Sequence, residues 1–501
     1  MEKRVNSKKD YIQLVSDAAH REYADVEQEM TALREAKGIT FKEFYQNRLW
    51  EQSVTQQHIT ARKILRRRQR KSDNLSLAAD YLGVTKKDVN RKIKQINDKG
   101  IFKMTAFLYG RFEVYRYSDE ELDEVLYKFA RRRELRKSLR EKLNAVDAGE
   151  LTYADLDEEL QALYAVFQEL MPESMYETLK EKLSYSRPDL MTEEEPLRAA
   201  LLDMAVTKYL LGFGDDEYVS FHFVGKTLEE KHEFITDIER MKILKTINDV
   251  NCFDYLDDKY KAYSLLKKYY RRKAIFVTSE EDYKAFNRFC FGRKKVVIKP
   301  YCDSMGRGIK PVDTKRSTRE ALFKELCEEY GSFIVEELIQ PHDAIRTLNP
   351  DSVNTVRVIT YFDGEKTIIH DTFMKVGKKG SFVDNGGAGG IFVSVDPITG
   401  KFKSNGCDEN GVIYETHPDT GVPFIGYQLP DWEQARALGM ELSTKVPGLK
   451  YIGWDFTYTK KKKWIIVEGN AKTQFFGQQC TTGVGMRKNF IETVNYVPAE
   501  E

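Results

Sequence analysis

Residues 451–470, YIGWDFTYTKKKKWIIVEGN, constrain the fold more than any other stretch of the chain. Residues rich in Ile, Val, Tyr, Trp and Phe flank a run of four lysines at 460–463, a pattern that predicts two strands joined by a short basic turn. If the turn is centred between Lys461 and Lys462, Asp455 lies directly opposite Glu468. The fold must then accommodate two like charges that face each other across one ladder, an arrangement that is destabilising by itself.

A third oxygen donor belongs to the same patch. Asn470 is two residues beyond Glu468, so its side chain leaves the strand on the same face. A hard divalent cation such as magnesium would remove the repulsion between Asp455 and Glu468 and use all three groups as ligands. The alternative is an ordinary solvated hairpin face whose acids are unrelated.

Composition limits the class of protein. With 501 residues the chain exceeds one compact core, and 41% hydrophobic and 12% aromatic residues predict folded domains. The 80 basic and 79 acidic residues leave a net charge of +1, which gives no overall attraction to nucleic acid or to an anionic membrane. Six scattered cysteines without a CxxC pair predict neither a disulfide framework nor a zinc site. Without a signal-like start or a long apolar run, we expect a cytoplasmic protein with no membrane insertion.

The first 190 residues are expected to be almost wholly helical, because glycine and proline are sparse and apolar residues recur periodically. Within them, LGVTKKDVNRKIKQI (82–96) predicts a turn with a threonine N-cap before a helix. The two prolines and the acidic run of 184–197 predict a linker. After it, a pattern that changes from helix to strands with glycine loops predicts a second domain over 198–495.

Two basic runs, 61–71 and 130–142, leave a different function open. Together with the turn at 82–96, they are compatible with a helical nucleic-acid-binding or scaffold protein. The alternative is that they are solvated helix faces, with acids interleaved in the second run. The acidic excess over 144–195 favours this alternative, so no DNA partner is expected.

The segment VVIKPYCDSMGRGI (296–309) predicts a buried strand that ends at Lys299 and continues into a loop with Ser304, Gly306 and Gly308. A lysine at a strand end can reach a phosphate, and small residues let backbone N–H groups approach phosphate oxygens. By itself the segment is also compatible with a β-turn and an incidental lysine.

The segment FIVEELIQPHD (333–343) predicts a further strand, with Glu336 and Glu337, followed by a loop that carries His342 and Asp343. Main-chain groups at such a strand end can pair with a purine, and nearby acids suit ribose hydroxyls. A half-exposed edge strand is the alternative.

Two later segments add charged residues to strands. NPDSVNTVRVITYF (349–362) places Asn354 and Arg357 on a strand suited to burial, where an arginine needs an anionic substrate or a structural salt bridge. In 371–400, two strands flank DNGGAGG, a glycine-rich loop that can fold over a ligand, with Lys375 nearby. A flexible surface loop is the alternative for DNGGAGG.

In this order, the motifs resemble the ATP-grasp superfamily, and most of all its sugar-transfer-associated family, over about 200–490. The most specific matches are SVNTVR, then VDNGGAGGI with VDPITG, then GWDF with VEGN. The resemblance implies an α+β ATP-grasp fold, with ATP held between two antiparallel sheets, preceded by the all-α region 1–190. It divides the domain into a helical part at 198–295, a nucleotide-clamping part at 296–345 and a catalytic sheet at 346–495.

The resemblance also implies roles for individual residues. The nucleotide would be bound by Lys259, Lys299, Ser304, Met305, Gly306, Gly308, Glu336, Glu337, Leu338, Ile339 and Asp343. The catalytic residues would be Asn354, Arg357 and Lys375. The metal ligands, for two magnesium ions, would be Asp455, Glu468 and Asn470. Many relatives carry arginine where this chain has Lys375, and that exchange keeps the charge but loses the bidentate geometry.

The function that the resemblance implies is an ATP- and magnesium-dependent carboxylate–amine ligase that proceeds through an acyl-phosphate. Its acid and amine substrates would be small molecules or glycan-linked groups in the biosynthesis of a cell-surface polysaccharide or a related metabolite. A kinase that phosphorylates a hydroxyl acceptor is the alternative with the same ATP site. The sequence leaves open whether the helical region 1–190 builds part of the acceptor site, forms a homodimer or docks a partner.

Overall fold

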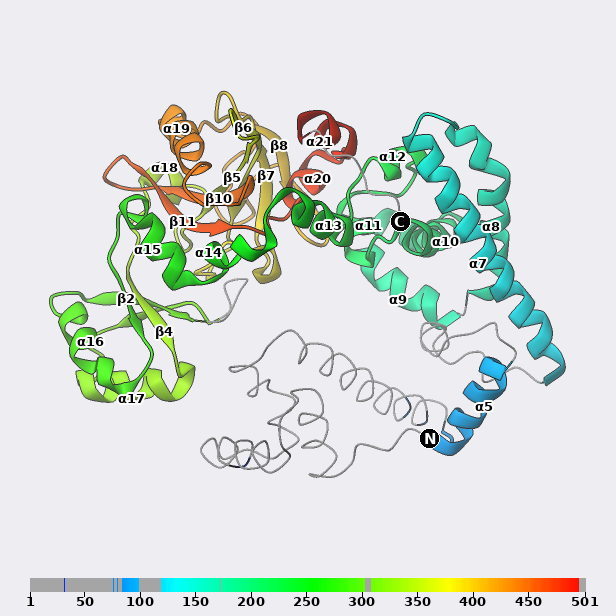
Figure 1. Cartoon of the computed structure of the whole chain (residues 1–501), viewed down its shortest axis with the longest axis horizontal. Helices are drawn as coiled ribbons and strands as arrows, with labels where there is room; N and C mark the ends of the chain where they lie inside the picture. Colours follow the sequence, from blue (N-terminus) through cyan, green and yellow to red (C-terminus); the bar gives the residue numbers. More distant parts are fainter. Residues whose placement is uncertain are drawn as a thin grey trace. The chain divides into compact units, whose positions relative to one another are not determined.

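The computed structural model describes residues 31, 75, 79, 83–98, 119–171, 173–301 and 308–494 (Figure 1). Contacts divide the chain into two compact units, Met1–Ala130 and Arg131–Glu501. The expected domain boundary at 190–198 does not coincide with this division and stays a prediction.

In the first unit, helix α5 (Lys86–Asp98) follows the turn that the sequence predicts. Gly83 has a left-handed φ of 66°, and the Thr85 hydroxyl accepts a hydrogen bond from the Asp88 amide at 3.2 Å. The predicted threonine cap is therefore confirmed. The basic run 61–71 lies outside the described residues.

The second basic run lies in helix α7 (Asp119–Asp147) and packs within the chain. The guanidinium groups of Arg132 and Arg136 both lie 4.8 Å from the centre of the Tyr209 ring, and Lys137 pairs with Glu141 at 3.7 Å. Cation–π packing and an acid one turn away thus engage three basic residues of this run within the chain.

A layer of helices forms the first part of the second unit. Its elements are η3 (Tyr153–Leu156), α8 (Asp157–Leu170), α9 (Glu173–Ser184), η4 (Pro188–Thr192), α10 (Glu194–Leu211), α11 (Asp215–Ser220), α12 (Leu228–His232) and α13 (Asp237–Ile247). The stretch expected to be a linker contains η4 and the start of α10, and its Leu190 and Leu197 are buried in the core of this layer. The 184–197 segment is therefore packed rather than a free connection, because two of its leucines find apolar neighbours.

A seven-stranded antiparallel sheet forms the larger wall of the site, in the order β11-β10-β5-β6-β7-β8-β9. Its strands are β5 (Thr355–Phe362), β6 (Thr367–Val376), β7 (Ile391–Val395), β8 (Phe402–Cys407), β9 (Ile413–Tyr414), β10 (Tyr451–Tyr458) and β11 (Trp464–Asn470). The predicted hairpin around DNGGAGG is confirmed, since β6 pairs antiparallel with β7, and the short helix η7 (Gly386–Ala388) lies between them.

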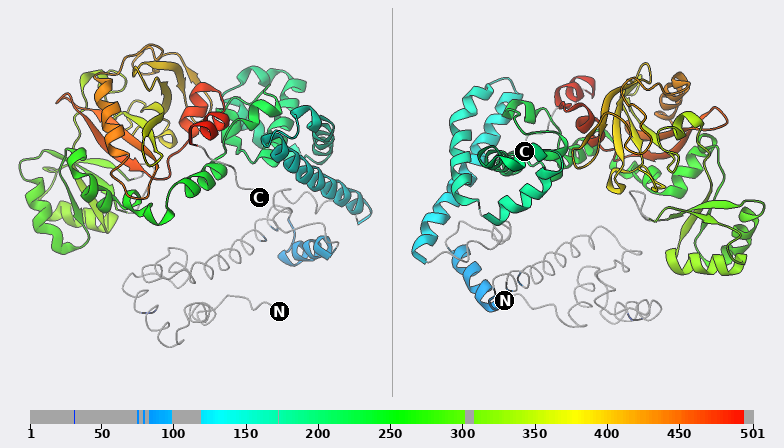
Figure 2. Two further views of the ribbon diagram at one scale, coloured as in Figure 1. Left: turned by 45° about the horizontal axis from the view of Figure 1, so that its top comes forward. Right: turned by 180° about the vertical axis from the view of Figure 1, so that it is seen from behind.

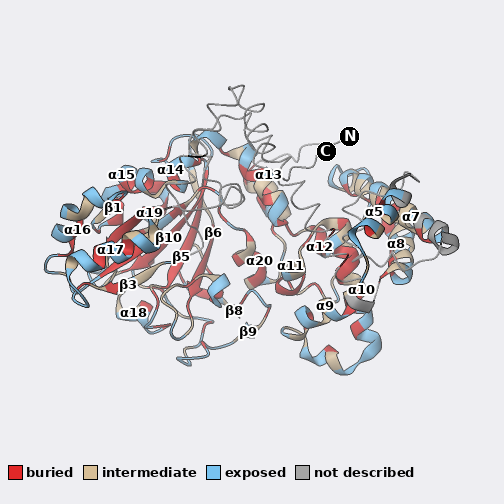
Figure 3. Ribbon diagram, turned by 90° about the horizontal axis from the view of Figure 1, so that it is seen from below, coloured by how far each residue is buried: buried red, intermediate tan, exposed pale blue. Residues whose placement is uncertain are grey.

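Apolar residues cover both faces of this large sheet, whose strands are mostly buried (Figure 3). One face packs against α14 (Asp254–Asp257), α15 (Lys259–Tyr270) and α19 (Trp432–Leu442). The other face packs against α20 (Phe476–Thr482), α21 (Arg487–Val494) and the helical layer. The helical layer and the catalytic sheet therefore share one hydrophobic core.

A smaller four-stranded antiparallel sheet has the order β1-β4-β2-β3 (Figure 2). Its strands are β1 (Ala274–Val277), β2 (Lys295–Pro300), β3 (Lys310–Asp313) and β4 (Phe333–Glu337). Helices α16 (Tyr283–Cys290) and α17 (Arg319–Tyr330) pack on one face through residues such as Phe286, Phe323 and Val335. Side chains alternate along a strand, so Val297, Lys299 and Glu336 leave the opposite face. The strands predicted at 296–300 and 333–337 are confirmed.

Three short helical segments complete the described elements: η5 (Val250–Cys252), η6 (Glu280–Asp282) and α18 (Asp343–Arg346).

The hairpin at 451–470 has the predicted partners at the site and a shifted register near its turn. Asp455 lies opposite Glu468 and Gly453 opposite Asn470, but Phe456 pairs with Ile466. Val467 is therefore a bulge residue with no partner on β10, and the assumed pairing is wrong by one residue from the bulge to the turn.

No helix in the described part of the chain combines the length and the apolar character that crossing a membrane requires.

Candidate active site

One cleft lies between the two sheets. The small sheet and its following loop contribute Val297, Lys299, Ile309, Glu336, Glu337 and Ile339. The large sheet and its loops contribute Val353, Thr355, Lys375, Phe382, Val383, Asp384, Asn385, Asp455, Val467 and Glu468. The cleft thus brings the Lys299 strand to the Asp455 hairpin, as the sequence predicts.

On the large wall, the Asp455 carboxylate lies between two cations. Arg357 donates from Nε to Oδ1 at 2.6 Å and from Nη2 to Oδ2 at 3.0 Å, and Lys375 Nζ lies 3.0 Å from Oδ2. The strand order brings these three side chains together. Arg357 on β5 is paired with both Asp455 on β10 and Phe373 on β6, and Lys375 is two residues beyond Phe373. All three side chains are buried.

Burial and the two cations act in opposite directions on Asp455. Burial raises the pKa of its carboxyl, but the charges of Arg357 and Lys375 outweigh burial and lower the pKa to about 2. Asp455 is therefore ionised at neutral pH. Arg357 Nη1 also donates to the Thr473 hydroxyl at 2.9 Å, so three of its nitrogens are held in fixed positions.

Glu468 differs from Asp455 although it lies directly across the ladder. Its side chain is exposed and, among the described residues, it has no ion-pair partner. The Asn470 amide lies 3.4 Å from Asp455 Oδ2. Two carboxylates and one amide thus share one patch, as the sequence predicts, and this donor set fits magnesium. No cluster of three His, Cys, Asp or Glu side chains suited to a metal occurs in the described residues, so the amide is needed to complete this set.

On the small wall, the Glu336 carboxylate also lies between two cations. Lys299 Nζ lies 2.8 Å and Arg272 Nε 3.0 Å from Glu336 Oε2. Burial raises the pKa of Glu336, and the charges of Arg272 and Lys299 overcome this and lower it to about 2. Lys299 is therefore held by its partner within the lining of the cleft.

Arg272 also connects the two walls. Its Nη1 donates to the Ile466 carbonyl at 2.5 Å and its Nη2 to the Val467 carbonyl at 3.0 Å. Both carbonyls lie at the β11 bulge, where the irregular pairing leaves acceptors for a side chain. One buried guanidinium thus contacts the large sheet through main chain and the small sheet through Glu336.

The two walls differ in charge. On the small wall, Arg272 and Lys299 pair with the carboxylate of Glu336, and the other lining carboxylate, Glu337, is paired with Arg293. The large wall has two cations but three carboxyl groups, because Asp384 lies in the cleft beside Asp455 and Glu468. Burial raises the pKa of Asp384, and Lys375 opposes that rise. The small wall suits phosphate groups, and the acid-rich wall opposite suits a divalent cation.

Three of the predicted residues lie elsewhere. Asn354 is buried with a left-handed φ of 48°, and its amide donates to the carbonyls of Asn349 at 2.7 Å and Ile345 at 3.2 Å. It positions a turn and does not line the cleft. Lys259 begins α15 and donates to the Tyr301 carbonyl at 3.4 Å, and Asp343 begins the short helix α18 with an exposed side chain.

The glycine loop is only partly described. Ser304, Met305 and Gly306 lie outside the described residues. Gly308 has a left-handed φ of 68°, and a Cβ there would lie 2.8 Å from the Pro300 ring. This position therefore requires glycine, which agrees with a tight approach at the end of β2.

The strand end expected to contact adenine lies at the cleft. Ile339 lines the cleft, and Leu338 lies between it and β4. The Glu337 side chain pairs with Arg293 at 2.5 Å and accepts from the Lys273 amide at 2.9 Å. The Glu337 side chain therefore stabilises the junction of β1, β2 and β4, and Glu337 also forms part of the cleft lining.

Sequence reasoning missed Arg272, Asp384 and Thr473. Arg272 follows a helix in the basic run RRK, where nothing marks one arginine as buried. Asp384 lies inside the VDNGGAGG motif, and its Oδ2 accepts from both the amide and the hydroxyl of Thr355 at 2.6 Å. The signal for Asp384 in the sequence was an acid at the start of the glycine-rich loop DNGGAGG.

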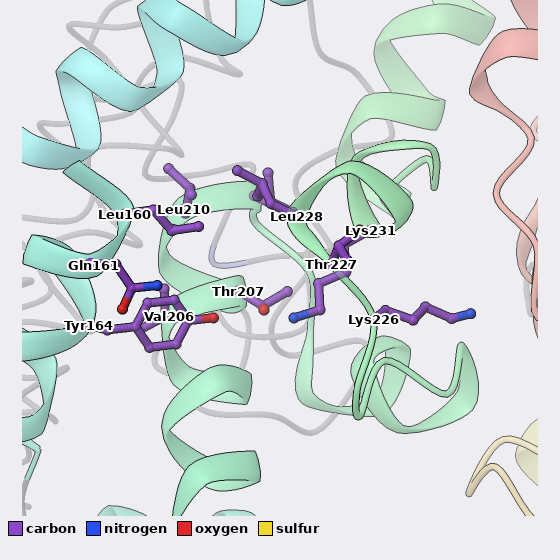
Figure 4. Close-up of a pocket in the computed structure, with 11 residues that line it drawn as sticks. Leu160, Gln161, Tyr164, Val206, Thr207, Leu210, Lys226, Thr227, Leu228 and Lys231 are labelled. Atoms are coloured by element: carbon purple, nitrogen blue, oxygen red, sulfur yellow. The ribbon is translucent and has the colours of Figure 1, made fainter. Parts of the chain in front are cut away.

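A second cavity, of about 270 Å³, lies in the helical layer (Figure 4). Leu160, Val206, Leu210 and Leu228 line it together with polar residues such as Thr207. Two lining residues, Tyr164 and Lys231, contact the carboxylate of Asp203. Asp203 accepts from Lys231 at 2.6 Å through both oxygens and from the hydroxyls of Tyr164 and Tyr218. This network is internally neutral, and the cavity lies outside the cleft.

The family model for sugar-transfer associated ATP-grasp proteins matches residues 239–495, just over half of the chain. This chain belongs to the sugar-transfer associated ATP-grasp family. Its fold is accordingly the ATP-grasp fold, preceded by helices, and both predictions are confirmed. No curated protein matches the chain.

Among solved structures, this ATP-grasp protein is similar to the ATP-grasp ligase PsnB complexed with a minimal precursor, at 12% identity and a TM-score of 0.30 over 49% of this chain and 67% of that one. D-alanyl-alanine synthetase A from Vibrio cholerae matches at 12% identity and a TM-score of 0.28, over 46% and 65%. An L-amino acid ligase from Bacillus licheniformis matches at 13% and 0.28, over 46% and 43%. The chain thus spans about two thirds of the first two proteins and less than half of the third, and the family model alone carries the assignment.

Proposed function

We propose that this ATP-grasp protein is an ATP- and magnesium-dependent carboxylate–amine ligase that acts in the biosynthesis of a cell-surface polysaccharide or a related metabolite. The observation that carries the proposal is the pair of opposed charge clusters in one cleft. On the small wall three cations exceed two carboxylates, because Glu337 has its own partner in Arg293, and carboxyl groups exceed cations on the other wall. A polyphosphate with its metal ion has the complementary pattern of charge.

In the proposed reaction, the γ-phosphoryl group of ATP moves to an oxygen of the acid substrate, which gives ADP and an acyl-phosphate. The amine nitrogen then attacks the acyl carbon, phosphate leaves with the electrons of the broken C–O bond, and the nitrogen loses a proton. Neither step needs a covalent bond to the protein. The residues of the chain therefore act by positioning and by electrostatic stabilisation.

Each cluster supplies a distinct part of this positioning. Lys299 faces the cleft from the small wall, where Glu336 holds its amino group in place for the phosphates. Arg357 and Lys375 hold the opposite wall and would orient the transferring phosphoryl group. Magnesium bound by Asp455, Glu468 and Asn470 would neutralise charge on the phosphate oxygens.

The loop between β6 and β7 supplies the exclusion of water that an acyl-phosphate requires. Phe382 and Val383 line the cleft, and Asp384 fixes the loop through its two hydrogen bonds to Thr355. An apolar cover held in this way keeps water from the reactive carbon before the amine arrives.

The proposal is tested by a screen for ADP release over candidate acids, with and without candidate amines, and mass analysis of the products. We expect ADP and phosphate in equal amounts, and an amide whose formation requires both substrates. A phosphorylated product formed without an amine and without free phosphate would identify a kinase instead. Absence of ADP release over the whole panel of acids would contradict the ligase.

A further inference from the structure

A basic and apolar surface lies on the side of the small sheet away from the cleft. In α16, Phe286, Phe289 and Cys290 are buried in the core against the sheet. Lys284, Arg288 and Phe291 are exposed and occur at i, i+4 and i+7, so they lie along one outer stripe that continues past the end of the helix. This stripe faces solvent, as the pale blue outer surface of α16 shows (Figure 3).

Further basic residues join the stripe from the neighbouring strands. Lys294 directly precedes β2, and its carbonyl accepts from the Thr314 amide at 2.9 Å, which places Lys315 next to it. Lys284, Arg288, Lys294 and Lys315 are all exposed, and none of them has an ion-pair partner among the described residues. We call these four residues and Phe291 the α16 surface.

Phe291 has the most unusual environment of the α16 surface. Its side chain is 83% exposed, the largest fraction of any large hydrophobic residue in the described chain. It caps the C-terminus of α16 and precedes Gly292, which has a left-handed φ of 74° and turns the chain into β2. The ring therefore protrudes from the tip of a turn and has basic side chains on both sides of it.

We propose that the α16 surface docks the protein on an anionic membrane surface. Basic side chains are attracted to the negative potential of anionic lipids, and one protruding aromatic ring can enter the headgroup region. The net charge of +1 for the whole chain hides this local excess. The acids nearest in sequence are Asp282, which precedes α16 at its other end, and Asp313, which pairs with Lys295 on the other face of the sheet. A single protruding ring is less suited to single-stranded nucleic acid, which is bound in grooves with several stacking aromatics.

Docking at this position leaves the cleft accessible. Helix α16 covers one face of the small sheet, and Lys299 and Glu336 leave the other. Lys295, two residues before Val297, leaves the cleft-side face of β2 and is not part of the α16 surface. The α16 surface thus places the membrane behind the nucleotide wall, and the proposal does not depend on which reaction the cleft catalyses.

The test is co-sedimentation of the full chain with vesicles of phosphatidylcholine alone and of phosphatidylcholine with about one quarter phosphatidylglycerol. We expect binding to the anionic vesicles only, and weaker binding at high salt. The double variant Lys294→Gln/Lys315→Gln should bind about 25-fold more weakly, at about fivefold for each charge removed. Phe291→Ala should weaken binding about 10-fold, since it removes the apolar ring.

Matched control variants are available elsewhere on the surface. Ile398→Ala changes another apolar residue, 69% exposed, and Lys401→Gln/Lys403→Gln removes two other exposed charges. Both controls should bind vesicles as the unmodified protein does. The proposal is overturned if the unmodified protein does not sediment with anionic vesicles, or if the α16 variants bind as tightly as the controls. Equal loss of binding in the controls would also overturn it, because general positive charge would then explain the attraction.

Discussion

The two walls of the cleft carry the same motif of charges in different settings. Each has one buried carboxylate between a lysine and an arginine, Glu336 with Lys299 and Arg272, and Asp455 with Lys375 and Arg357. In both, the cations lower the pKa of the carboxyl to about 2 against the effect of burial.

The difference lies in what each arginine contacts besides its acid. Arg357 is tied to Thr473, which follows β11, so the Asp455 cluster belongs entirely to the large sheet and its loops. Arg272 donates to β11 carbonyls while it pairs with Glu336 of the small sheet, so the Glu336 cluster joins the two walls. The comparison shows that one arginine ties its cluster to a single wall, whereas the other links the two walls.

The largest expected effect is that of Asp455→Ala. This variant leaves Arg357 and Lys375 buried without their common partner, and it should lower the free energy of unfolding by about 3–5 kcal/mol. Urea denaturation measures the change. Glu468→Ala, directly across the ladder but exposed, is the control and should change stability by less than about 0.5 kcal/mol. Equal losses in the two variants would show that Asp455 is not the centre of a buried cluster.

Next in size is Arg272→Gln, which should cost about 2–4 kcal/mol because it leaves Glu336 with one cation and the bulge carbonyls without a charged donor. We also expect faster proteolysis at the connections between the two sheets, since the guanidinium that joins them is lost. Lys273→Gln, at the next position but exposed, is the control. Unchanged proteolysis with a lowered stability would mean that Arg272 is only a core residue.

Acid should weaken both clusters. The folded-state pKa values of Asp455 and Glu336, about 2, lie below the values near 4 of an unfolded chain. Their stabilisation is therefore fully present above about pH 5 and is lost as the pH falls toward 2, by about 2 kcal/mol for each carboxyl. Urea midpoints at pH 7, 5 and 3 measure this loss. In Glu336→Gln the pH-dependent loss should be smaller by about 2 kcal/mol, and an unchanged profile would contradict the assigned pKa.

A smaller effect is expected from Gly453→Ala, which sharpens the account of the large wall. A Cβ at Gly453 would lie 2.1 Å from the Thr473 hydroxyl oxygen and 3.0 Å from Arg357 Cδ. Thr473 must then move away from Arg357, at a cost of about 1–3 kcal/mol. Thermal unfolding measures the cost, with Gly387→Ala as the control because no atom lies within 4 Å of a Cβ there. A neutral Gly453→Ala would show that the loop after β11 yields freely.

Much of this site could be predicted from the sequence, because it depends on the alternation of side chains along strands. The alternation of β10 and β11 places Asp455 opposite Glu468, and the order of strand motifs gives both sheets. The bulge at Val467 does not follow from the sequence, since a register shift leaves no mark in composition. Arg272 could not be identified for the same reason, because the carbonyls that it contacts become available only at that bulge.

The motifs predict equal roles for Asp455 and Glu468 as metal ligands, whereas the surroundings of the two side chains differ. Long-range pairing puts two cations on Asp455 and leaves Glu468 exposed to the cleft. Asn354 was a candidate on the grounds of its motif, but a left-handed backbone turns its amide toward main-chain carbonyls. Both differences depend on tertiary contacts that a local pattern does not contain.

The central claim is that the acid-rich wall binds magnesium together with ATP, and titration calorimetry of ATP with and without magnesium tests it most directly. Glu468→Gln should leave stability almost unchanged, because the side chain is exposed. We expect magnesium to strengthen ATP binding to the unmodified protein, and Glu468→Gln to remove at least about 10-fold of that gain without changing binding in the absence of magnesium. The same magnesium-dependent gain in Glu468→Gln as in the unmodified protein would contradict the claim.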